Sequence, residues 1–280
     1  MTLAVITDSS VNLPEDLKNH EHLYSLDIPI FLDGETYVEG KNLEQAVFYE
    51  KMAASKELPK TSQPSLADFD ELLSDFEEKG YDQVIGLFLS SGISGFWQNS
   101  QFLKDEHPNL TMAIPDTKIT AAPMGAMVRN CLDWSQDGVE FHEILSRLTQ
   151  QIDGTRAYIL VDDLNHLVKG GRLSNGSALL GNLLSIKPIL EFDQEGKIVV
   201  FEKVRTEKKA LKRLAELAQE PVAQDTEFMI LHTNAQAKAE QFQEQLATIG
   251  VTDVSVAPLC AVIATHLGEG AVVLAYTPKF

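Results

Sequence analysis

The fold is decided by the stretch from Ser65 to Gly95, which reads SLADFDELLSDFEEKGYDQVIGLFLSSGISG. Its first half predicts an amphipathic helix over residues 65–79, because apolar side chains recur three and four positions apart. These side chains are Leu66, Phe69, Leu72, Leu73 and Phe76. Gly80 is expected to end the helix, the run Gln83–Leu89 predicts a buried strand, and Ser90–Gly95 predicts a small-residue turn before another helix.

The same alternation of strands and helices continues on both sides of this stretch. Further strands are expected at Leu3–Thr7 and Leu110–Ile114, and further helices at Leu43–Ser55, Ala121–Asp133 and Glu140–Gln151. Strands that alternate with helices are typical of a parallel sheet covered by helices. We therefore expect an α/β protein whose N-terminal domain, residues 1–154, is a three-layer α/β/α unit with a mostly parallel sheet.

The pattern changes after residue 154. Expected strands are Ala157–Val161, Lys187–Phe192, Lys197–Val204, Glu227–His232, Val254–Pro258 and Ala271–Tyr276, and expected helices are Ser177–Leu184, Thr206–Gln219 and Ala235–Ile249. The turn Asp193–Gly196 predicts a hairpin, because glycine accepts the positive φ that such turns need. We therefore expect a C-terminal α/β domain, residues 155–280, with a mixed or antiparallel sheet.

Composition excludes several classes of protein. The chain has 280 residues, with 23 Lys and Arg against 41 Asp and Glu, which gives a formal net charge of −18. This charge argues against nucleic acid or an anionic membrane surface as the main partner. No apolar run approaches the roughly 20 residues of a membrane span. No basic, apolar leader opens the chain, so a cytoplasmic protein without membrane insertion is expected.

Metal and disulfide chemistry are poorly supported by the sequence. The two cysteines, Cys131 and Cys260, are far apart and form no C-x-x-C motif. A reducing compartment fits this usage. His20 and His22 form the only close histidine pair, and spacing specifies no acidic partner for them. We expect no metal and no cofactor.

Two hydroxyl-rich loops are the first candidates for a binding site. Ser90–Gly95, which includes Ser94, follows a strand and precedes a helix, and ligands of open α/β sheets bind at such strand ends. Free backbone amides there attract phosphate or carboxylate, although a plain helix-capping turn fits equally well. Thr61 and Ser62 lie in the loop Lys60–Ser65 and exceed what capping requires. They would join the same anion site if both loops share one edge of the sheet.

Two further segments carry a single chemical group each. Arg172 follows Gly170 and Gly171 and could bind a carboxylate or phosphate with two parallel hydrogen bonds. His266 lies in the small-residue segment Thr265–Ala271 and is the side chain most readily charged near neutral pH. The plainer interpretations are a surface arginine and a structural histidine.

A serine hydrolase acting on acyl substrates through Ser94 and His266 is an alternative. The segment Gly92-Ile-Ser94-Gly-Phe96 resembles the G-x-S-x-G nucleophile elbow but lacks its last glycine. A sensor of non-lipid anions is a third hypothesis for the same residues.

Taken together, the motifs resemble one family. They are Thr7–Ser10, Thr61–Ser65, Ser90–Gly95, Leu164–Arg172, Ser185–Leu190 and Thr265–Gly268. Their order and spacing, over nearly the whole chain, resemble the DegV family of fatty-acid-binding proteins. The FakB binding subunits of bacterial fatty acid kinase belong to that family. Two positions depart from its pattern: Phe96–Trp97, which bears on the shape of the site mouth, and Glu269, which we expect to point outward.

The resemblance implies two α/β domains with a long-chain fatty acid between them. Its carboxylate would lie at the domain junction and its chain in an apolar tunnel. The ligand-binding residues implied are Thr61, Ser62, Ser94, Gly95, His266 and Arg172. A separate ATP-dependent kinase would convert the bound acid to an acyl phosphate for phospholipid synthesis, so this chain would not itself be an enzyme. Kinase contact would involve Arg205 and, if it does not face the carboxylate, Arg172.

Overall fold

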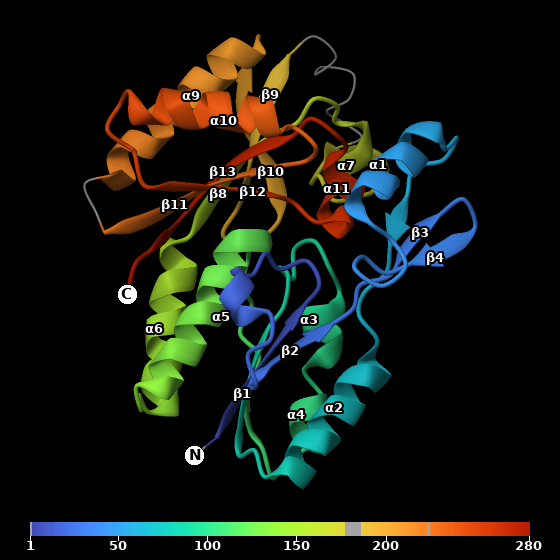
Figure 1. Cartoon of the computed structure of the whole chain (residues 1–280), viewed down its shortest axis with the longest axis vertical. Coiled ribbons are helices and arrows are strands. Elements are labelled where there is room, and N and C mark those ends of the chain that lie inside the picture. The colour runs from blue at the N-terminus through green and yellow to red at the C-terminus, as the bar shows by residue number, and fades with distance from the viewer. Residues whose placement is uncertain (1, 177–185, 223–224) are drawn as a thin grey trace.

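The computed structural model describes residues 2–176, 186–222 and 225–280, and it confirms the α/β fold with a parallel sheet and a mixed sheet. The N-terminal half is built on a four-stranded parallel sheet in the order β2-β1-β6-β7 (Figure 1). The strands are β1 (Leu3–Asp8), β2 (Leu23–Leu26), β6 (Gln83–Leu87) and β7 (Thr111–Ala113). The expected helix Ser177–Leu184 lies outside the described residues.

Helix α2 (Leu66–Lys79) forms as its sequence predicts. The Ser65 hydroxyl accepts the backbone N–H of Asp68, which satisfies one free donor of the first turn. Gly80 ends the helix in the left-handed conformation, with φ 80°. The apolar stripe buries three large side chains against the sheet, namely Phe69, Leu73 and Phe76. Their burial fixes α2 on one face of the parallel sheet.

Helices cover both faces of this sheet, as expected for three layers. On the face of α2 lie the short helices α3 (Phe96–Ser100) and α4 (Leu103–Glu106). On the opposite face lie α5 (Ala121–Gln136) and α6 (Phe141–Gly154), whose pairing is visible in Figure 1. Because α5 and α6 also contact the second sheet, they form a layer that both halves share.

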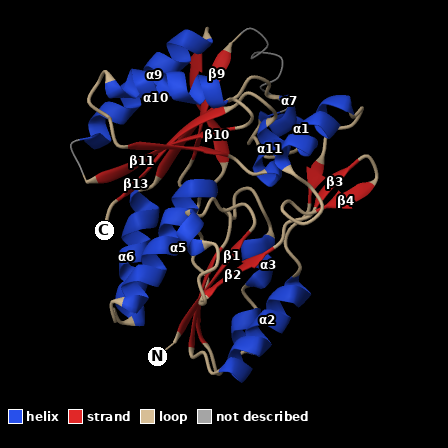
Figure 2. Cartoon of the chain, viewed as in Figure 1, coloured by secondary structure: helices blue, strands red, loops and turns tan. Residues whose placement is uncertain are grey.

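The C-terminal half is built on a six-stranded mixed sheet in the order β10-β9-β8-β13-β11-β12. The strands are β8 (Arg156–Leu160), β9 (Lys187–Phe192), β10 (Ile198–Val204), β11 (Thr226–His232), β12 (Val254–Pro258) and β13 (Val272–Pro278). Helices α9 (Glu207–Val222) and α10 (Gln236–Ala247) cover one face (Figure 2). The predicted β9–β10 hairpin is confirmed, and Gly196 has φ 70° in its turn.

A third, small sheet was not predicted. It is antiparallel and consists of β3 (Ile30–Leu32), β4 (Glu35–Tyr37) and β5 (Lys60–Thr61). Helix α1 (Gln45–Ala54) lies between β4 and β5 in the sequence. A short helix of the C-terminal half, α11 (Ala261–Leu267), contacts β3 and β5, and α7 (Asn165–Lys169) packs on α11. The small sheet of the N-terminal half therefore packs against the C-terminal half.

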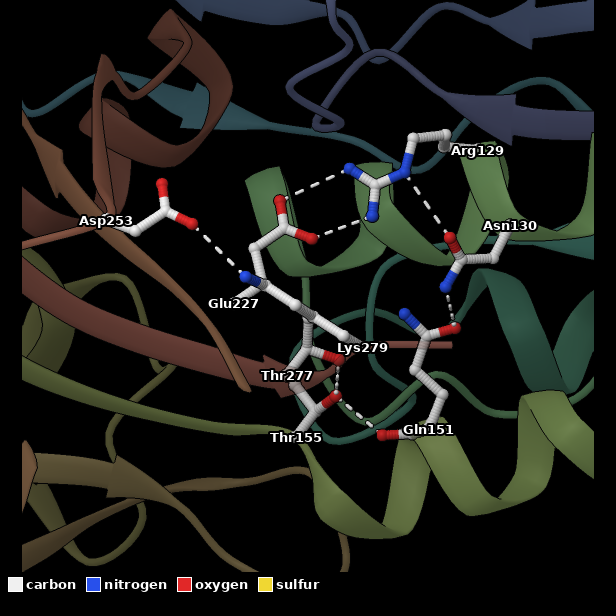
Figure 3. A network of polar contacts seen from close by, with 8 residues as sticks. All are labelled: Arg129, Asn130, Gln151, Thr155, Glu227, Asp253, Thr277 and Lys279. Atoms are coloured by element: carbon white, nitrogen blue, oxygen red, sulfur yellow. Dashed lines mark hydrogen bonds and ion pairs between the residues drawn. The ribbon is translucent and has the colours of Figure 1, made fainter. Parts of the chain in front are cut away.

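Polar bonds join the shared helices to the six-stranded sheet on the side away from α11 (Figure 3). Arg129 of α5 holds both carboxylate oxygens of Glu227 on β11, at 3.2 and 2.7 Å. A second chain runs from Asn130 to Gln151 of α6, and the hydroxyl of Thr155 bonds both the Gln151 carbonyl and the Thr277 hydroxyl. The main hydrophobic core also draws on both halves. The domain boundary at 154 stays a prediction.

Candidate functional site

A cavity lies between the six-stranded sheet and the N-terminal half, with about 750 Å³ of space between its walls. Most of its lining is apolar and comes from loops, α5 and α11. These side chains include Ile28, Leu89, Ile119, Ala121, Leu259 and Val262. A largely apolar lining is usual for sites that enclose a small molecule.

Strand periodicity gives the cavity its floor. Successive side chains of a strand point to opposite faces. On β8 the cavity is lined by Ala157 and Ile159, and on β13 by Val273 and Ala275. Ala157 pairs directly with Ala275 in the antiparallel register. Because two alanines lie side by side, the floor is lowest there and leaves room that larger residues would fill.

Polar residues meet at the end of the cavity beside α11. The Thr61 hydroxyl, on β5, lies 2.8 Å from Nε2 of His266, on α11. This bond joins two residues 205 positions apart in the chain. It exists because the small sheet β4-β3-β5 docks on α11, where Glu39 accepts the backbone N–H of Ala261 at 2.6 Å. The docked segment therefore carries Thr61 to the histidine.

His266 is held neutral. Burial, reinforced by the positive charge of Arg172 and by His166, lowers the pKa of the imidazole from 6.5 to about 3. Its Nδ1 atom is buried against Gly170 and has no hydrogen-bond partner among the described residues. A β-carbon at Gly170 would lie 2.9 Å from that nitrogen, so the glycine gives the ring its space.

The two hydroxyl-rich loops, Lys60–Ser65 and Ser90–Gly95, both border the cavity. Asn99 of α3 donates to the Gln63 side-chain oxygen at 2.9 Å, which ties the Thr61–Ser65 loop to the helix that follows Ser94. Ser94 lines the cavity, and its hydroxyl accepts the backbone N–H of Phe96 at 3.3 Å. Ser62 also lines the cavity, with its hydroxyl donating to the Gln63 carbonyl. Gly95 lies directly behind Ser94 as the first residue before α3.

Arg172 is half-buried and lines the cavity near His266. Its guanidinium donates to the backbone carbonyl of Ile93 at 3.2 Å and to that of Gly170 at 2.7 Å. These bonds fix the turn that carries Ser94 to the segment that packs on His266. Arg205 lies apart from the cavity lining, exposed between β10 and α9.

The geometry does not support the hydrolase hypothesis. The His266 Nε2 atom pairs with Thr61 rather than with Ser94. The other ring nitrogen has no carboxylate to orient it among the described residues, because it faces Gly170. A serine nucleophile needs a base in hydrogen-bond reach and a third group behind that base. Thr61, Ser62, Ser94, His266 and Arg172 instead line one cavity as hydrogen-bonding groups.

Residues of the motif Thr7–Ser10 hold parts of the cavity wall in place without being part of its lining. The buried Asp8 carboxylate accepts the backbone N–H of Leu89 at 2.7 Å and the Ser10 hydroxyl at 2.5 Å. Burial raises the pKa of Asp8, and these hydrogen bonds oppose that effect. Ser9 accepts the N–H of Ile28 at 2.9 Å. The motif Thr7–Ser10 therefore holds two residues of the cavity wall, Ile28 and Leu89, in place.

The two departures from the family pattern also have a place. Phe96 is fully buried in the core on the α2 face of the parallel sheet, and the Trp97 indole donates to the Ile114 carbonyl. Neither residue lines the cavity, so the pair does not shape its mouth. Glu269 is exposed and accepts a hydrogen bond from Asn234, which confirms that it points outward.

Metal-ligating clusters and membrane-spanning helices are both absent from the described residues, 2–176, 186–222 and 225–280. No three His, Cys, Asp or Glu side chains gather there as a metal site. No helix in those ranges has the length and apolar character to cross a bilayer.

Comparison with known proteins gives consistent matches along the whole chain. The sequence profile of the DegV family, described as an uncharacterised protein family, matches residues 2–279. A DegV domain-containing protein of Streptococcus pyogenes serotype M3 is 61% identical, with 100% of both chains covered.

Two solved structures align over 100% of both chains. A fatty acid binding DegV family protein from Streptococcus agalactiae is 59% identical, with a TM-score of 0.98. DegV from Bacillus subtilis, described as a fatty acid binding protein, is 35% identical, with a TM-score of 0.88. The chain belongs to the DegV family.

Proposed function

We propose that this protein binds a long-chain fatty acid, with the carboxylate at Thr61, Ser94 and His266 and the alkyl chain in the apolar cavity. The observation that carries the proposal is one cavity with an apolar wall and a cluster of hydroxyl, imidazole and guanidinium groups at the end beside α11. The descriptions of the S. agalactiae and B. subtilis relatives as fatty acid binding proteins support it.

A relay of hydrogen bonds would present a donor to the carboxylate. A proton on Nδ1 would be a buried N–H without an acceptor among the described residues, so we assign the proton of neutral His266 to Nε2, where it can donate to Thr61. The Thr61 hydroxyl then keeps its own hydrogen for the ligand. Bonds in such a chain strengthen one another in a poorly solvated site. The nearby Arg172 charge favours the anion over the protonated acid.

The apolar wall would supply most of the affinity. Each buried methylene contributes about 0.8 kcal/mol, so a chain of roughly 16 carbons gains far more than the carboxylate contacts alone. Ordering the flexible chain offsets part of this gain. The result suits a carrier that holds its ligand through transfer rather than an enzyme that releases it.

The fate of the ligand follows from the same role. We propose that a separate ATP-dependent kinase phosphorylates the bound acid to an acyl phosphate, and that this chain presents the substrate without catalysing the step. Exposed Arg205 is the proposed contact, because it is free of the cavity and is available to a partner surface. Arg172 remains with the cavity, since its donors hold the Ser94 turn and the Gly170 carbonyl.

Binding of matched ligands tests the proposal. Protein stripped of lipid is titrated with a C16 acid, the C16 alcohol and a C4 acid. We expect one C16 acid per chain, weaker binding of the alcohol, and no measurable binding of the C4 acid. Equal binding of acid and alcohol would place the carboxylate outside the polar cluster. Preference for the C4 acid would favour the anion-sensor hypothesis.

The kinase step needs its own test. A cognate kinase and ATP are added to the loaded protein, and acyl phosphate is measured for wild type, Arg205→Ala and the exposed control Lys56→Ala. We expect Arg205→Ala alone to slow the reaction while C16 binding stays unchanged. Equal rates for all three proteins would remove Arg205 from the contact surface.

A further inference from the structure

A second cleft adjoins the cavity and differs from it in chemistry. It is a space of about 1280 Å³ that opens to solvent. Charged and polar side chains dominate its lining, including Lys118, Asp153, Arg156, Glu191 and Asp193. Among residues 2–176, 186–222 and 225–280, only Ile119 and Phe192 line both spaces. The apolar cavity and the polar cleft are therefore separated at this point by two side chains.

Phe192 is the thinner part of this wall. Ile119 is only 3% exposed, whereas Phe192 is half-buried and lines both the cavity and the cleft. Phe192 ends β9 and pairs with Ile198 on β10. Since its neighbour Glu191 pairs with Tyr158, the antiparallel register places Phe192 beside Ala157. The ring therefore lies next to the lowest part of the cavity floor.

The position of this wall relative to Ser94 is fixed by the hairpin turn. The Ser90 hydroxyl donates to the Gly196 carbonyl at 2.7 Å. A β-carbon at Gly92 would lie 2.2 Å from that same carbonyl oxygen, so the two glycines let the chains touch. Ser90 and Gly92 belong to the turn that carries Ser94. One rigid contact therefore links the turn at the carboxylate end to the hairpin that carries Phe192.

We propose that Phe192, backed by Ile119, is the stop that sets the longest acyl chain this protein holds. This inference rests on the proposed function, because it takes the carboxylate to lie at Thr61 and His266. A methylene that is buried in the cavity raises affinity about fourfold. A methylene pushed past Phe192 enters the hydrated cleft among Lys118, Arg156 and Glu191 and gains nothing comparable. Affinity should therefore rise with chain length and then stop rising at one length.

Truncating the ring tests the stop. Saturated acids from C12 to C22 are titrated into lipid-free wild type, Phe192→Ala and the milder Phe192→Leu. The matched control is Phe201→Ala, because Phe201 lies on the same hairpin but packs on Tyr158 at the other face and is 36% exposed. We expect both Phe192 variants to move the optimum to longer acids. The affinity ratio of C20 to C16 should rise at least about tenfold in Phe192→Ala, which is less than the gain from two buried methylenes.

The outcomes separate this inference from the proposed function. If wild type binds no acid at any length, the proposed function is wrong and the stop has no meaning. If wild type binds but both Phe192 variants keep its chain-length profile, Phe192 is not the stop. The same result follows if Phe201→Ala shifts the profile as far as Phe192→Ala does. Circular dichroism melting of each variant confirms that the titrated protein is folded.

Discussion

The two faces of the six-stranded sheet are made by the same strands, but one face is packed in a core and the other borders a cavity. On the face of α9 and α10, large side chains such as Tyr158, Leu160 and Leu274 pack tightly into a closed core. On the opposite face, Ala157 and Ala275 border a cavity. The residues alternate along β8 and β13, so the contrast comes from side-chain size at neighbouring positions.

This difference separates residues that stabilise the protein from residues that keep space open. Protein interiors are normally close-packed, and an empty apolar space costs stability. We propose that the space kept open by small residues in this cavity serves a ligand instead. Substitutions on the two faces should therefore have opposite consequences: filling the open face should cost binding, and emptying the packed face should cost stability.

The first expected effect comes from filling the open face with Ala275→Leu. The added side chain takes the room of about three methylenes, and at about 0.8 kcal/mol each this is about 2.4 kcal/mol, or a roughly 60-fold loss of C16 affinity. The melting temperature of the lipid-free protein should change little, because the new atoms occupy existing space. Calorimetric titration measures the affinity. Unchanged C16 binding would show that the chain does not pass over Ala275.

The matched change on the packed face is Leu274→Ala, one residue away. It removes a fully buried side chain, and we expect the free energy of unfolding to fall by about 2–5 kcal/mol. C16 affinity of the folded protein should stay close to that of wild type. Urea denaturation measures the loss. A ligand-binding defect larger than the stability defect would mean that the two faces are not independent.

Removing the hydroxyl at the polar end should also weaken C16 binding. Thr61→Val keeps the shape but deletes the proposed donor to the carboxylate, so C16 affinity should fall by about 1.5–3 kcal/mol, or roughly 10- to 150-fold. Thr61→Ser keeps the hydroxyl and should restore most of the affinity. The C16 alcohol provides the internal comparison, since its binding should respond less. An equal loss for acid and alcohol would contradict a carboxylate at Thr61.

The last expected effect concerns the pH dependence of stability. The pKa of His266 is lowered from 6.5 to about 3 in the folded chain, so below pH 6.5 the unfolded chain binds a proton that the folded chain does not. This histidine should therefore lower the free energy of unfolding by up to about 1.4 kcal/mol per pH unit as the pH falls. His266→Gln lacks this contribution. Lipid-free wild type should lose more stability than the variant between pH 6 and pH 4. Parallel curves would contradict a buried, neutral His266.

The fold was largely predictable because its elements carry local signals. The stripe and caps of α2 and the glycine turn of the β9–β10 hairpin act over a few residues, and the structure has both. The small sheet was missed because β3, β4 and β5 are two or three residues long. Strands this short show no periodicity, and contact with α11 rather than propensity holds them. Helix α11 was missed as well, because glycines follow it closely in the sequence.

The site was predictable in its polar part only. Motifs identified Thr61, Ser62, Ser94, His266 and Arg172 as candidates, and the structure brings these side chains to one cavity. An apolar tunnel was expected, but its residues could not be named, because Ala157 and Ala275 come together only through the register of strands whose paired residues are 118 positions apart. The bonds of Arg172 to the Ile93 and Gly170 carbonyls also depend on tertiary packing, which left its role open at the level of sequence.

A crystal structure of the protein loaded with a C16 acid tests the central claim most directly. We predict one acyl chain per protein, its carboxylate within hydrogen-bond distance of Thr61 and Ser94, and its alkyl chain over Ala157 and Ala275 toward Phe192. A chain bound in the reverse direction, or bound outside this cavity, would contradict the account.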